Sequence, residues 1–288
     1  AWVGLFKSAD CGRTWKTNLV HGYPQDVSPE GLLSPLKGLG AAADPIVRAG
    51  TNGLFYYSGL AFDRGKNGLS KVFVARFIDN NDETSDPIVY LGTSVVDTGN
   101  SGQFLDKPYI AVDIPRAGAP TCSVVGPGPA VQQFPGGAVY ITWAAFVGKQ
   151  SNNVTKLMVA RSNDCGVTWE RPIKISEGSQ TNQGATMAID PGSGAVYVAW
   201  RQFAHDDQPN AILVAKSTDG GRSFSKEVRV STINPFDQST SGVSFRTYAY
   251  PTVAIDGNGR VYVAWSARGF SGLRPDPVGG DARVVMST

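Results

Sequence analysis

Arginine, carboxylate and tyrosine side chains recur where loops are expected to follow or precede short strands. A planar guanidinium group binds a carboxylate through two hydrogen bonds, so several such residues together predict a site for an acidic sugar. The candidate ligand-binding residues are Asp63, Arg64, Arg201, His205, Asp206, Asp207, Arg246, Tyr248 and Arg268, with Asp44 and Asp106 at the starts of two strands.

These residue types also have a plainer interpretation. Arg201 and Arg268 follow the strands "VYVAW" closely, and a solvated arginine at a strand end commonly pairs with a nearby carboxylate. The "HDD" at 205–207 fits a polar loop tip as well as a binding group. The repeated Trp143, Trp200 and Trp265 are expected to pack in the core and not to serve as sugar platforms.

One short segment is rich in carboxylates. "DNNDETSD" at 79–86 offers Asp79, Asn81 and Glu83 as calcium ligands, although it lacks the glycine at the sixth position of a calcium loop. The two histidines lie far apart and the three cysteines form no C-x-x-C, so the sequence does not predict a zinc site. Apart from this calcium hypothesis we expect no cofactor.

A turn motif, S-x-D-x-G-x-[TS]-[WF], occurs at 8–15, 162–169 and 217–224. We expect its Asp to accept hydrogen bonds from backbone N–H groups two residues on, and its Gly to supply the positive φ of a tight hairpin. The aromatic residue that follows should anchor the returning strand in a core. The motif residues are Asp10, Gly12, Trp15, Asp164, Gly166, Trp169, Asp219, Gly221 and Phe224.

Short apolar strands repeat around these motifs. "KPYIAVD" (107–113), "ATMAID" (185–190) and "PTVAIDGNG" (251–259) are followed by "GGAVYITW", "SGAVYVAW" and "NGRVYVAW". One unit therefore contains four strands, which predicts an all-β protein, specifically a β-propeller of four-stranded antiparallel blades. A sandwich would not repeat in this way.

The repeats predict a single propeller domain over 1–288. Its predicted parts are a partial blade at 1–22, blades at about 44–97, 107–177 and 183–232, and an unfinished blade at 247–288. Asp79 marks a degenerate copy of the turn motif. We expect six or more blades in the complete protein, of which this sequence would be a fragment.

Composition narrows the classes of partner. The sequence has 26 basic and 24 acidic side chains, a net charge of +2, and no run of Lys and Arg interleaved with aromatic residues, so nucleic acid is not an expected partner. No apolar run reaches the roughly 18 residues that a membrane helix needs. We therefore predict no membrane span.

S-x-D-x-G-x-T-W is the Asp box, and with the "VYVAW" strands it makes nearly the whole chain similar to the sialidase-like (BNR repeat) β-propeller superfamily. That superfamily includes exo-α-sialidases, xyloglucan-cleaving glycosidases, sortilin-type receptors and photosystem assembly factors. Its sialidases use three arginines, a tyrosine nucleophile assisted by a glutamate, and an aspartate acid/base. The first arginine belongs to an R-I-P motif that this sequence lacks, so the resemblance assigns no catalytic residue here.

Two functional hypotheses follow from the resemblance and the loops. The first is an extracytoplasmic module that binds a glycan or a protein through its loops, which the scarcity of glutamate in those loops favours. The alternative is a glycoside hydrolase, most plausibly an exo-α-sialidase, with part of its active site outside this chain. The sequence leaves open whether the protein is an enzyme.

The cysteines bear on the compartment. Cys11 and Cys165 follow the Asp of Asp boxes in blades that are not neighbours, too far apart for a disulfide. Cys122 lies in the insertion 114–135, which should emerge at the same rim as Cys165, so we predict a Cys122–Cys165 disulfide. Cys11 would pair with a residue preceding this chain. Such bonds indicate a secreted or extracytoplasmic protein, in the periplasm or at the cell surface; the alternative is three free thiols in a cytosolic protein.

Overall fold

The computed structural model describes residues 1–65, 68–79, 88–119, 121–125, 131–148, 154–178, 180–205, 207–235, 248–269 and 283–288. Strands dominate this part of the chain, and its helix α1 (Pro29–Leu33) is short. The prediction of an all-β protein is therefore confirmed. None of the helical structure described is long and apolar enough to cross a bilayer.

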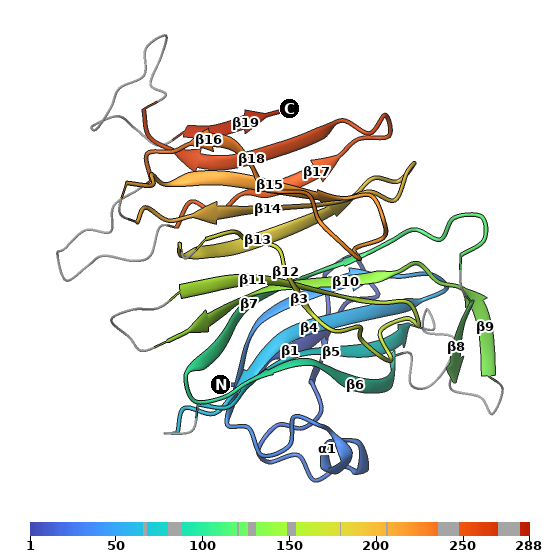
Figure 1. The fold of residues 1–288 in the computed structure, drawn as a ribbon. Helices are drawn as coiled ribbons and strands as arrows, with labels where there is room; N and C mark the ends of the chain where they lie inside the picture. Colours follow the sequence, from blue (N-terminus) through green and yellow to red (C-terminus); the bar gives the residue numbers. More distant parts are fainter. Residues whose placement is uncertain are drawn as a thin grey trace.

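Consecutive strands form antiparallel sheets, and Figure 1 shows four of these sheets stacked in sequence order. Blade 1 contains β3 (Ala41–Ala49), β4 (Leu54–Phe62), β5 (Ser70–Asp79) and β6 (Ile88–Gly99). Blade 2 contains β7 (Gln103–Val112), β10 (Val139–Val147), β11 (Val154–Ser162) and β12 (Ile173–Lys174). Blade 3 contains β13 (Asn182–Ile189), β14 (Val196–Gln202), β15 (Ala211–Ser217) and β16 (Val228–Thr232).

The remaining strands form smaller sheets. Blade 4 contains β17 (Thr252–Ile255), β18 (Val261–Ala267) and β19 (Arg283–Ser287). Two hairpins complete the set, β1 (Gly4–Lys7) with β2 (Lys16–Leu19), and β8 (Thr121–Val125) with β9 (Val131–Pro135). Blades 1, 2 and 3 are four-stranded antiparallel sheets, and with the Asp-box hairpins they form the predicted propeller architecture.

The first strands of the blades lie side by side, β3 against β7, β7 against β13 and β13 against β17. Apolar side chains fill the space between successive blades, because each sheet can bury its faces only against its neighbours. Trp143, Trp200 and Trp265 are buried in these layers, as expected for core residues. Trp200 Nε1 also donates a hydrogen bond to Asn182 Oδ1 at 2.9 Å.

The three Asp boxes share one hydrogen-bond pattern. In the box of blade 2, Ser162 Oγ donates to Asp164 Oδ1 (2.7 Å) and accepts from Gly166 N (2.8 Å). Asp164 accepts from the backbone N (2.9 Å) and Oγ1 (2.5 Å) of Thr168. The backbone hydrogen bond to the Asp therefore comes from the residue four positions on, and not two positions on as the sequence predicted. The reason is that Cys165 (φ 57°) and Gly166 (φ 76°) are both left-handed and tighten the turn.

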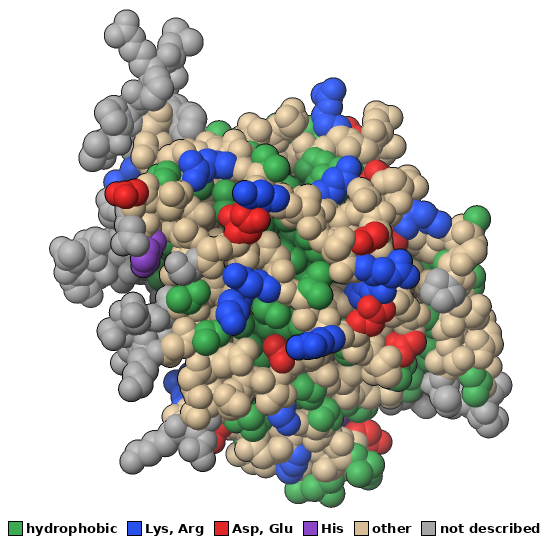
Figure 2. All heavy atoms as spheres, viewed as in Figure 1, with side chains coloured by type: hydrophobic (Ala, Val, Ile, Leu, Met, Phe, Trp, Pro, Cys, Tyr) green, Lys and Arg blue, Asp and Glu red, His purple; other side chains and the backbone are tan. Residues whose placement is uncertain are grey.

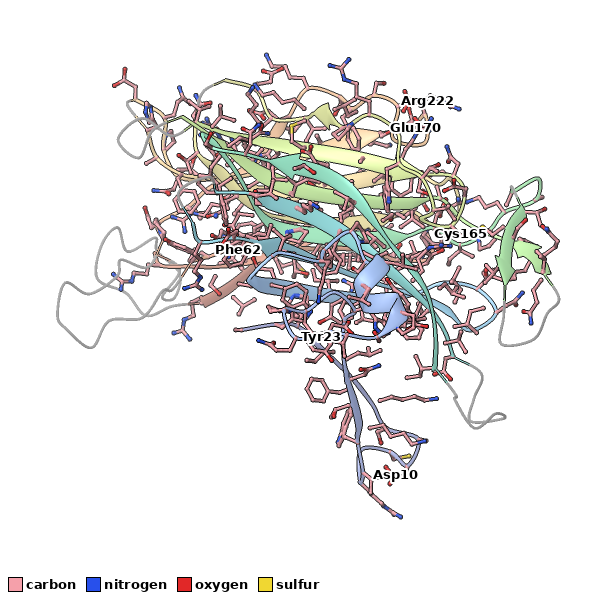
Figure 3. All side chains as sticks on the ribbon, turned by 90° about the horizontal axis from the view of Figure 1, so that it is seen from below. Asp10, Tyr23, Phe62, Cys165, Glu170 and Arg222 are labelled. Atoms are coloured by element: carbon pink, nitrogen blue, oxygen red, sulfur yellow. A yellow bond between two sulfur atoms is a disulfide. The ribbon has the colours of Figure 1, made fainter. Side chains whose placement is uncertain are left out.

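The aromatic residues of the boxes differ in environment. Trp169 packs on the core between blades 1 and 2 and donates from Nε1 to Ser94 Oγ at 2.9 Å, and Phe224 packs on the core between blades 2 and 3. Trp15 is 59% exposed, so the prediction that it anchors a strand in a core is wrong. The cause is its hairpin, which projects from the body of the molecule with Asp10 at the tip (Figure 3).

The predicted disulfide joins Cys122 to Cys165, with the two Cα atoms 5.9 Å apart. It ties the β8–β9 hairpin to the Asp box of blade 2, and Val124 and Phe134 of that hairpin complete the core between blades 1 and 2. Cys11 is exposed and forms no disulfide with any residue in the described ranges. Its pairing with a preceding residue stays a prediction.

Candidate functional site

Antiparallel order places two sets of loops at opposite ends of the sheets. The Asp boxes follow the third strand of a blade and lie at one end. The loops that follow β4, β10, β14 and β18, and the segments that precede β7, β13 and β17, lie at the other end, which we call the loop rim. Side chains on a rim of this kind are held by a rigid scaffold but are not needed for the core.

The first strand of three blades carries a β-bulge near the loop rim. In β3 the register shifts between Ala43 and Ile46, and in β13 it shifts between Gln183 and Thr186. In β7 it shifts in the part of the strand that faces Thr142 and Ala144 of β10. The bulged segments contain Asp44 (φ 52°), Lys107 (φ 50°) and Gly184 (φ 68°). A left-handed conformation is strained for Asp and Lys, and both this strain and bulges are concentrated at functional sites.

The bulges bring polar side chains from successive blades into contact. Gln183 Nε2 donates to Asp106 Oδ2 at 2.8 Å, and Tyr250 Oη donates to Gln183 Oε1 at 2.6 Å. Lys107 Nζ lies 6.0 Å from the centre of the Tyr250 ring. The carboxyl group of Asp44 lies near enough to that of Asp106 for the two to interact electrostatically. We call Asp44, Asp106, Lys107, Gln183 and Tyr250 the inner-strand cluster.

Burial controls the electrostatics of the inner-strand cluster. The pKa of Asp106 is raised, chiefly because its carboxyl group is withdrawn from water, and the charge of Asp44 adds to this rise. Lys107 and the hydrogen bond from Gln183 favour the ionised form but do not outweigh burial. Asp106 therefore keeps its proton to a higher pH than an ordinary aspartic acid.

A groove of about 490 Å³ opens above Asp106 and Gln183. We call it the rim groove, and its lining residues are Phe104, Asp106, Phe146, Thr181, Gln183, Phe203 and Tyr248. Phe104 and Tyr248 are each 39% exposed, unusually open for large aromatic side chains. The rim groove thus combines aromatic walls with a small polar floor, the usual composition of a ligand site.

Arg201 supports one wall of the rim groove. Its guanidinium Cζ lies 4.1 Å from the centre of the Phe203 ring, and Nη2 donates to Asn210 Oδ1 at 2.8 Å. The residue is only 4% exposed, and burial lowers its pKa. Its Nε has no hydrogen-bond partner in the described ranges. Arg201 is therefore a buried cation stacked against Phe203 and not the solvated strand end that its sequence position also allowed.

The other residues predicted for the site are dispersed. Tyr248 lines the rim groove, whereas Arg64 stacks over Phe62 with its Cζ 5.6 Å from the ring centre. His205 exchanges backbone hydrogen bonds with Gln208, Asp207 is exposed, and Arg268 N donates to Asn234 O. Asp63 Oδ1 accepts from Gly65 N at 3.2 Å. Asp206 and Arg246 lie outside the described residues, so convergence of Arg201, Arg246 and Arg268 on one ligand stays a prediction.

Seven residues of the groove and cluster were missed from the sequence, namely Phe104, Lys107, Phe146, Thr181, Gln183, Phe203 and Tyr250. The sequence does contain a signal for two of them, Lys107 and Tyr250. Asp44, Lys107 and Tyr250 each precede a proline at the start of a first strand, and Gly184 occupies the same place in blade 3. In blades 1, 2 and 3 that shared position is where the bulges form.

The proposed calcium ligands are only partly described. Asp79 Oδ1 accepts from Lys7 Nζ at 2.7 Å, while Asn81 and Glu83 lie outside the described residues. In the ranges that the structure covers, no three His, Cys, Asp or Glu side chains are grouped so that they could hold a metal ion.

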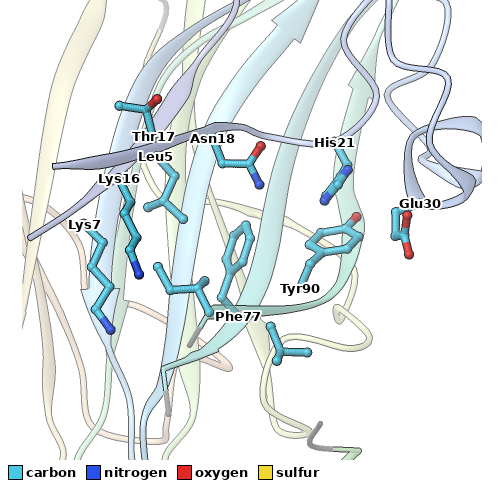
Figure 4. A pocket seen from close by; sticks show the side chains of 11 residues that line it. Leu5, Lys7, Lys16, Thr17, Asn18, His21, Glu30, Phe77 and Tyr90 are labelled. Carbon is cyan, nitrogen blue, oxygen red and sulfur yellow. The ribbon is translucent and has the colours of Figure 1, made fainter. Parts of the chain in front are cut away.

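A second cavity, of about 470 Å³, lies between the β1–β2 hairpin and blade 1 (Figure 4). Lys7 and Lys16 lie at one end, and His21, Tyr90 and Glu30 at the other. The His21 and Tyr90 rings are 4.5 Å apart, and Lys7 pairs with Asp79.

On the face drawn in Figure 2, acidic and basic side chains are interspersed, in keeping with the small net charge.

Comparison with known proteins gives structural likeness only. No family model matches the chain, and no curated protein matches it. Similar solved structures include a Hadza microbial sialidase (16% identity, 85% of this chain and 44% of that chain, TM-score 0.46) and an exo-1,5-α-L-arabinanase from a bovine ruminal metagenomic library (12%, 98% and 84%, 0.45). A Trypanosoma rangeli sialidase is 13% identical over 99% of this chain and 41% of its own, with a TM-score of 0.43.

The chain therefore spans less than half the length of either sialidase. Because these TM-scores are below 0.5, the propeller assignment rests on the strand order and on the Asp-box hydrogen bonds.

Proposed function

We propose that the protein is a carbohydrate-binding β-propeller and that the rim groove holds the sugar. The observation that carries this proposal is the combination, in one groove, of exposed aromatic rings with the hydrogen-bonded Asp106–Gln183–Tyr250 chain. A sugar ring has apolar C–H faces that pack on aromatic rings. Its hydroxyl groups both donate and accept hydrogen bonds, as carboxyl, amide and phenol groups require.

Charge favours a neutral sugar. Asp106 lies on the groove floor and Asp44 interacts with it electrostatically, so a carboxylate or phosphate on the bound molecule would meet like charge when these acids are ionised. A single nucleic-acid strand also stacks on aromatic side chains, but its sites track the backbone with positive charge. Arg201 stacks against Phe203, a wall residue of the groove, from a buried position. The acidic groove floor therefore favours binding of a neutral sugar, and not of the acidic sugar that the arginines in the sequence suggested.

Hydrolysis of a glycosidic bond is the second candidate function. A carboxyl group with a raised pKa is suited to protonate a leaving group, and Asp106 is one. The paired carboxyl groups of glycosidases are, however, separated by roughly 5 to 9.5 Å, so that a sugar carbon or a water fits between them. Among the described residues that line the rim groove Asp106 is the one acid, so no such partner faces it across the groove, which favours binding over hydrolysis.

A glycan array tests the proposal. The protein should bind neutral glycans, and Phe203→Ala and Tyr248→Ala should each weaken binding at least tenfold because each removes part of a groove wall. Phe6→Ala is the matched control, since Phe6 is 61% exposed on β1, a strand that does not line the rim groove. Absence of any glycan signal, or unchanged binding by both wall variants, would exclude the proposal.

Hydrolysis is tested separately. The protein is incubated with a panel of aryl glycosides and with the glycans that bind on the array. The binding proposal predicts no released product. Product formation that Asp106→Asn abolishes would establish the second candidate instead.

We also propose an extracytoplasmic location. The Cys122–Cys165 disulfide supports it, because such bonds persist in oxidising compartments and are rare in the cytosol. Thiol alkylation of the protein taken directly from its source cells should leave Cys122 and Cys165 unlabelled. Labelling of both without reduction would contradict the assignment.

A further inference from the structure

Aromatic side chains continue beyond the rim groove on the side of blade 1. Phe62, the last residue of β4, meets Phe104 edge to face, with ring centres 5.8 Å apart and an interplanar angle of 79°. The exposed Arg64 lies over Phe62, with its guanidinium carbon 5.6 Å from the ring centre. Two rings, set nearly perpendicular to each other, and one guanidinium group therefore continue the groove wall onto the neighbouring blade.

Aromatic side chains also continue on the side of blade 4. Phe203 and Tyr248 meet edge to face at 5.6 Å, and Tyr248 and Tyr250 are 5.4 Å apart. Tyr248 and Tyr250 belong to the segment that enters β17, whereas Phe203 follows β14 of blade 3. The loop rim thus carries rings from blades 1, 2, 3 and 4 on both sides of Asp106 and Gln183.

This arrangement is larger than one sugar requires. A single ring would occupy the polar floor and the walls formed by Phe104 and Phe203, leaving Phe62 and Arg64 without a role in binding. Of these rings Phe104 and Tyr248 are each 39% exposed. Exposed aromatic surface of this kind marks a binding groove, because water would otherwise contact it at a cost in free energy. Its extent along the rim indicates the extent of the bound molecule.

We infer that the rim groove binds an internal stretch of an oligosaccharide chain, at least three sugar rings long, and not a single terminal sugar. The middle ring lies over Asp106 and Gln183, and the flanking rings lie on Phe62 with Phe104 and on Phe203 with Tyr248. This inference rests on the proposed function and adds the length and course of the bound sugar.

Isothermal titration calorimetry with arabino-, xylo- and manno-oligosaccharides of one to six units tests the inference. In the series that binds, affinity should rise at least tenfold from one to three or four units and then level off. Phe62→Ala and Arg64→Ala should weaken binding of the hexasaccharide about threefold to tenfold and leave any monosaccharide binding unchanged. Phe203→Ala should weaken both.

Arg64→Ala is the safer of the two variants, because Arg64 is exposed while Phe62 also packs on the core between blades 1 and 2. Phe6→Ala is again the control. A monosaccharide that binds as tightly as the hexasaccharide, or an unchanged hexasaccharide affinity in Arg64→Ala, would overturn the inference while leaving carbohydrate binding intact. Binding of single-stranded RNA in place of every saccharide would overturn both the inference and the proposed function.

Discussion

Replacing Asp164 with alanine should destabilise the protein far more than the same change at Asp10. Asp164 accepts hydrogen bonds from Ser162 Oγ, Val167 N, and both N and Oγ1 of Thr168. At about 0.5–1.5 kcal/mol net for each bond, and allowing for partial replacement by water, Asp164→Ala should lower the free energy of unfolding by about 3 kcal/mol.

The two variants should differ in stability because the two Asp boxes have different neighbours. The box of Asp164 also positions Trp169, which packs on the core, and Cys165, which forms the disulfide. Asp10 makes the equivalent bonds to Ser8 and Thr14, but its Trp15 is largely exposed, so the box can open without disturbing a core. Asp10→Ala is thus a matched control with a small expected effect.

The effect of Asp164→Ala should depend on pH. Burial opposes ionisation of Asp164, but the hydrogen bonds from Thr168 and Ser162 outweigh it and lower its pKa. A carboxyl group with a lowered pKa stabilises the fold above its ordinary pKa, and this contribution is lost as the pH falls through the folded-state value. The difference between wild type and variant should therefore be greatest near pH 7 and shrink on acidification.

Urea unfolding followed by far-ultraviolet circular dichroism measures both variants. Equal losses of stability in Asp164→Ala and Asp10→Ala would refute the argument that the box acts by holding Trp169 and Cys165 in place. So would a loss in Asp164→Ala that does not change between pH 7 and pH 3.

Three further predictions follow from the site and the disulfide. Burial raises the pKa of Asp106, so its contribution to stability is present below its ordinary pKa and lost as the pH rises; Asp106→Asn should raise the melting temperature at pH 8 more than at pH 4, and a lower value at pH 8 would contradict this. Gly184→Ala places a Cβ 2.1 Å from Tyr250 Cδ1 and should weaken oligosaccharide binding at least tenfold in calorimetry, with unchanged circular dichroism; wild-type affinity would refute it. Cys165→Ser removes the disulfide between residues 43 apart in sequence and should lower the free energy of unfolding in urea by about 2–4 kcal/mol. An unchanged unfolding midpoint would contradict a stabilising role of the disulfide.

The sequence predicts the parts of this fold that depend on local patterns. The Asp boxes and the "VYVAW" strands are recognisable because each has its turn chemistry and its apolar alternation within a few residues. The Cys122–Cys165 disulfide could be predicted because strand order alone places both residues at the Asp-box end.

The residues that depend on neighbouring blades could not be predicted in the same way. Trp15 and Trp169 have the same motif, and only contact with another blade partly buries Trp169. Gln183 reaches Asp106 through a bulge in β13, which simple strand alternation does not reveal. A sequence also cannot show that the guanidinium of Arg201 turns back onto Phe203.

A crystal structure with a bound neutral oligosaccharide tests the central claim most directly. We predict sugar rings in the rim groove, packed on Phe104 and Phe203, with a hydroxyl group hydrogen-bonded to Asp106 or Gln183. An oligosaccharide bound instead at the Asp-box end, or in the cavity between the β1–β2 hairpin and blade 1, would contradict the account.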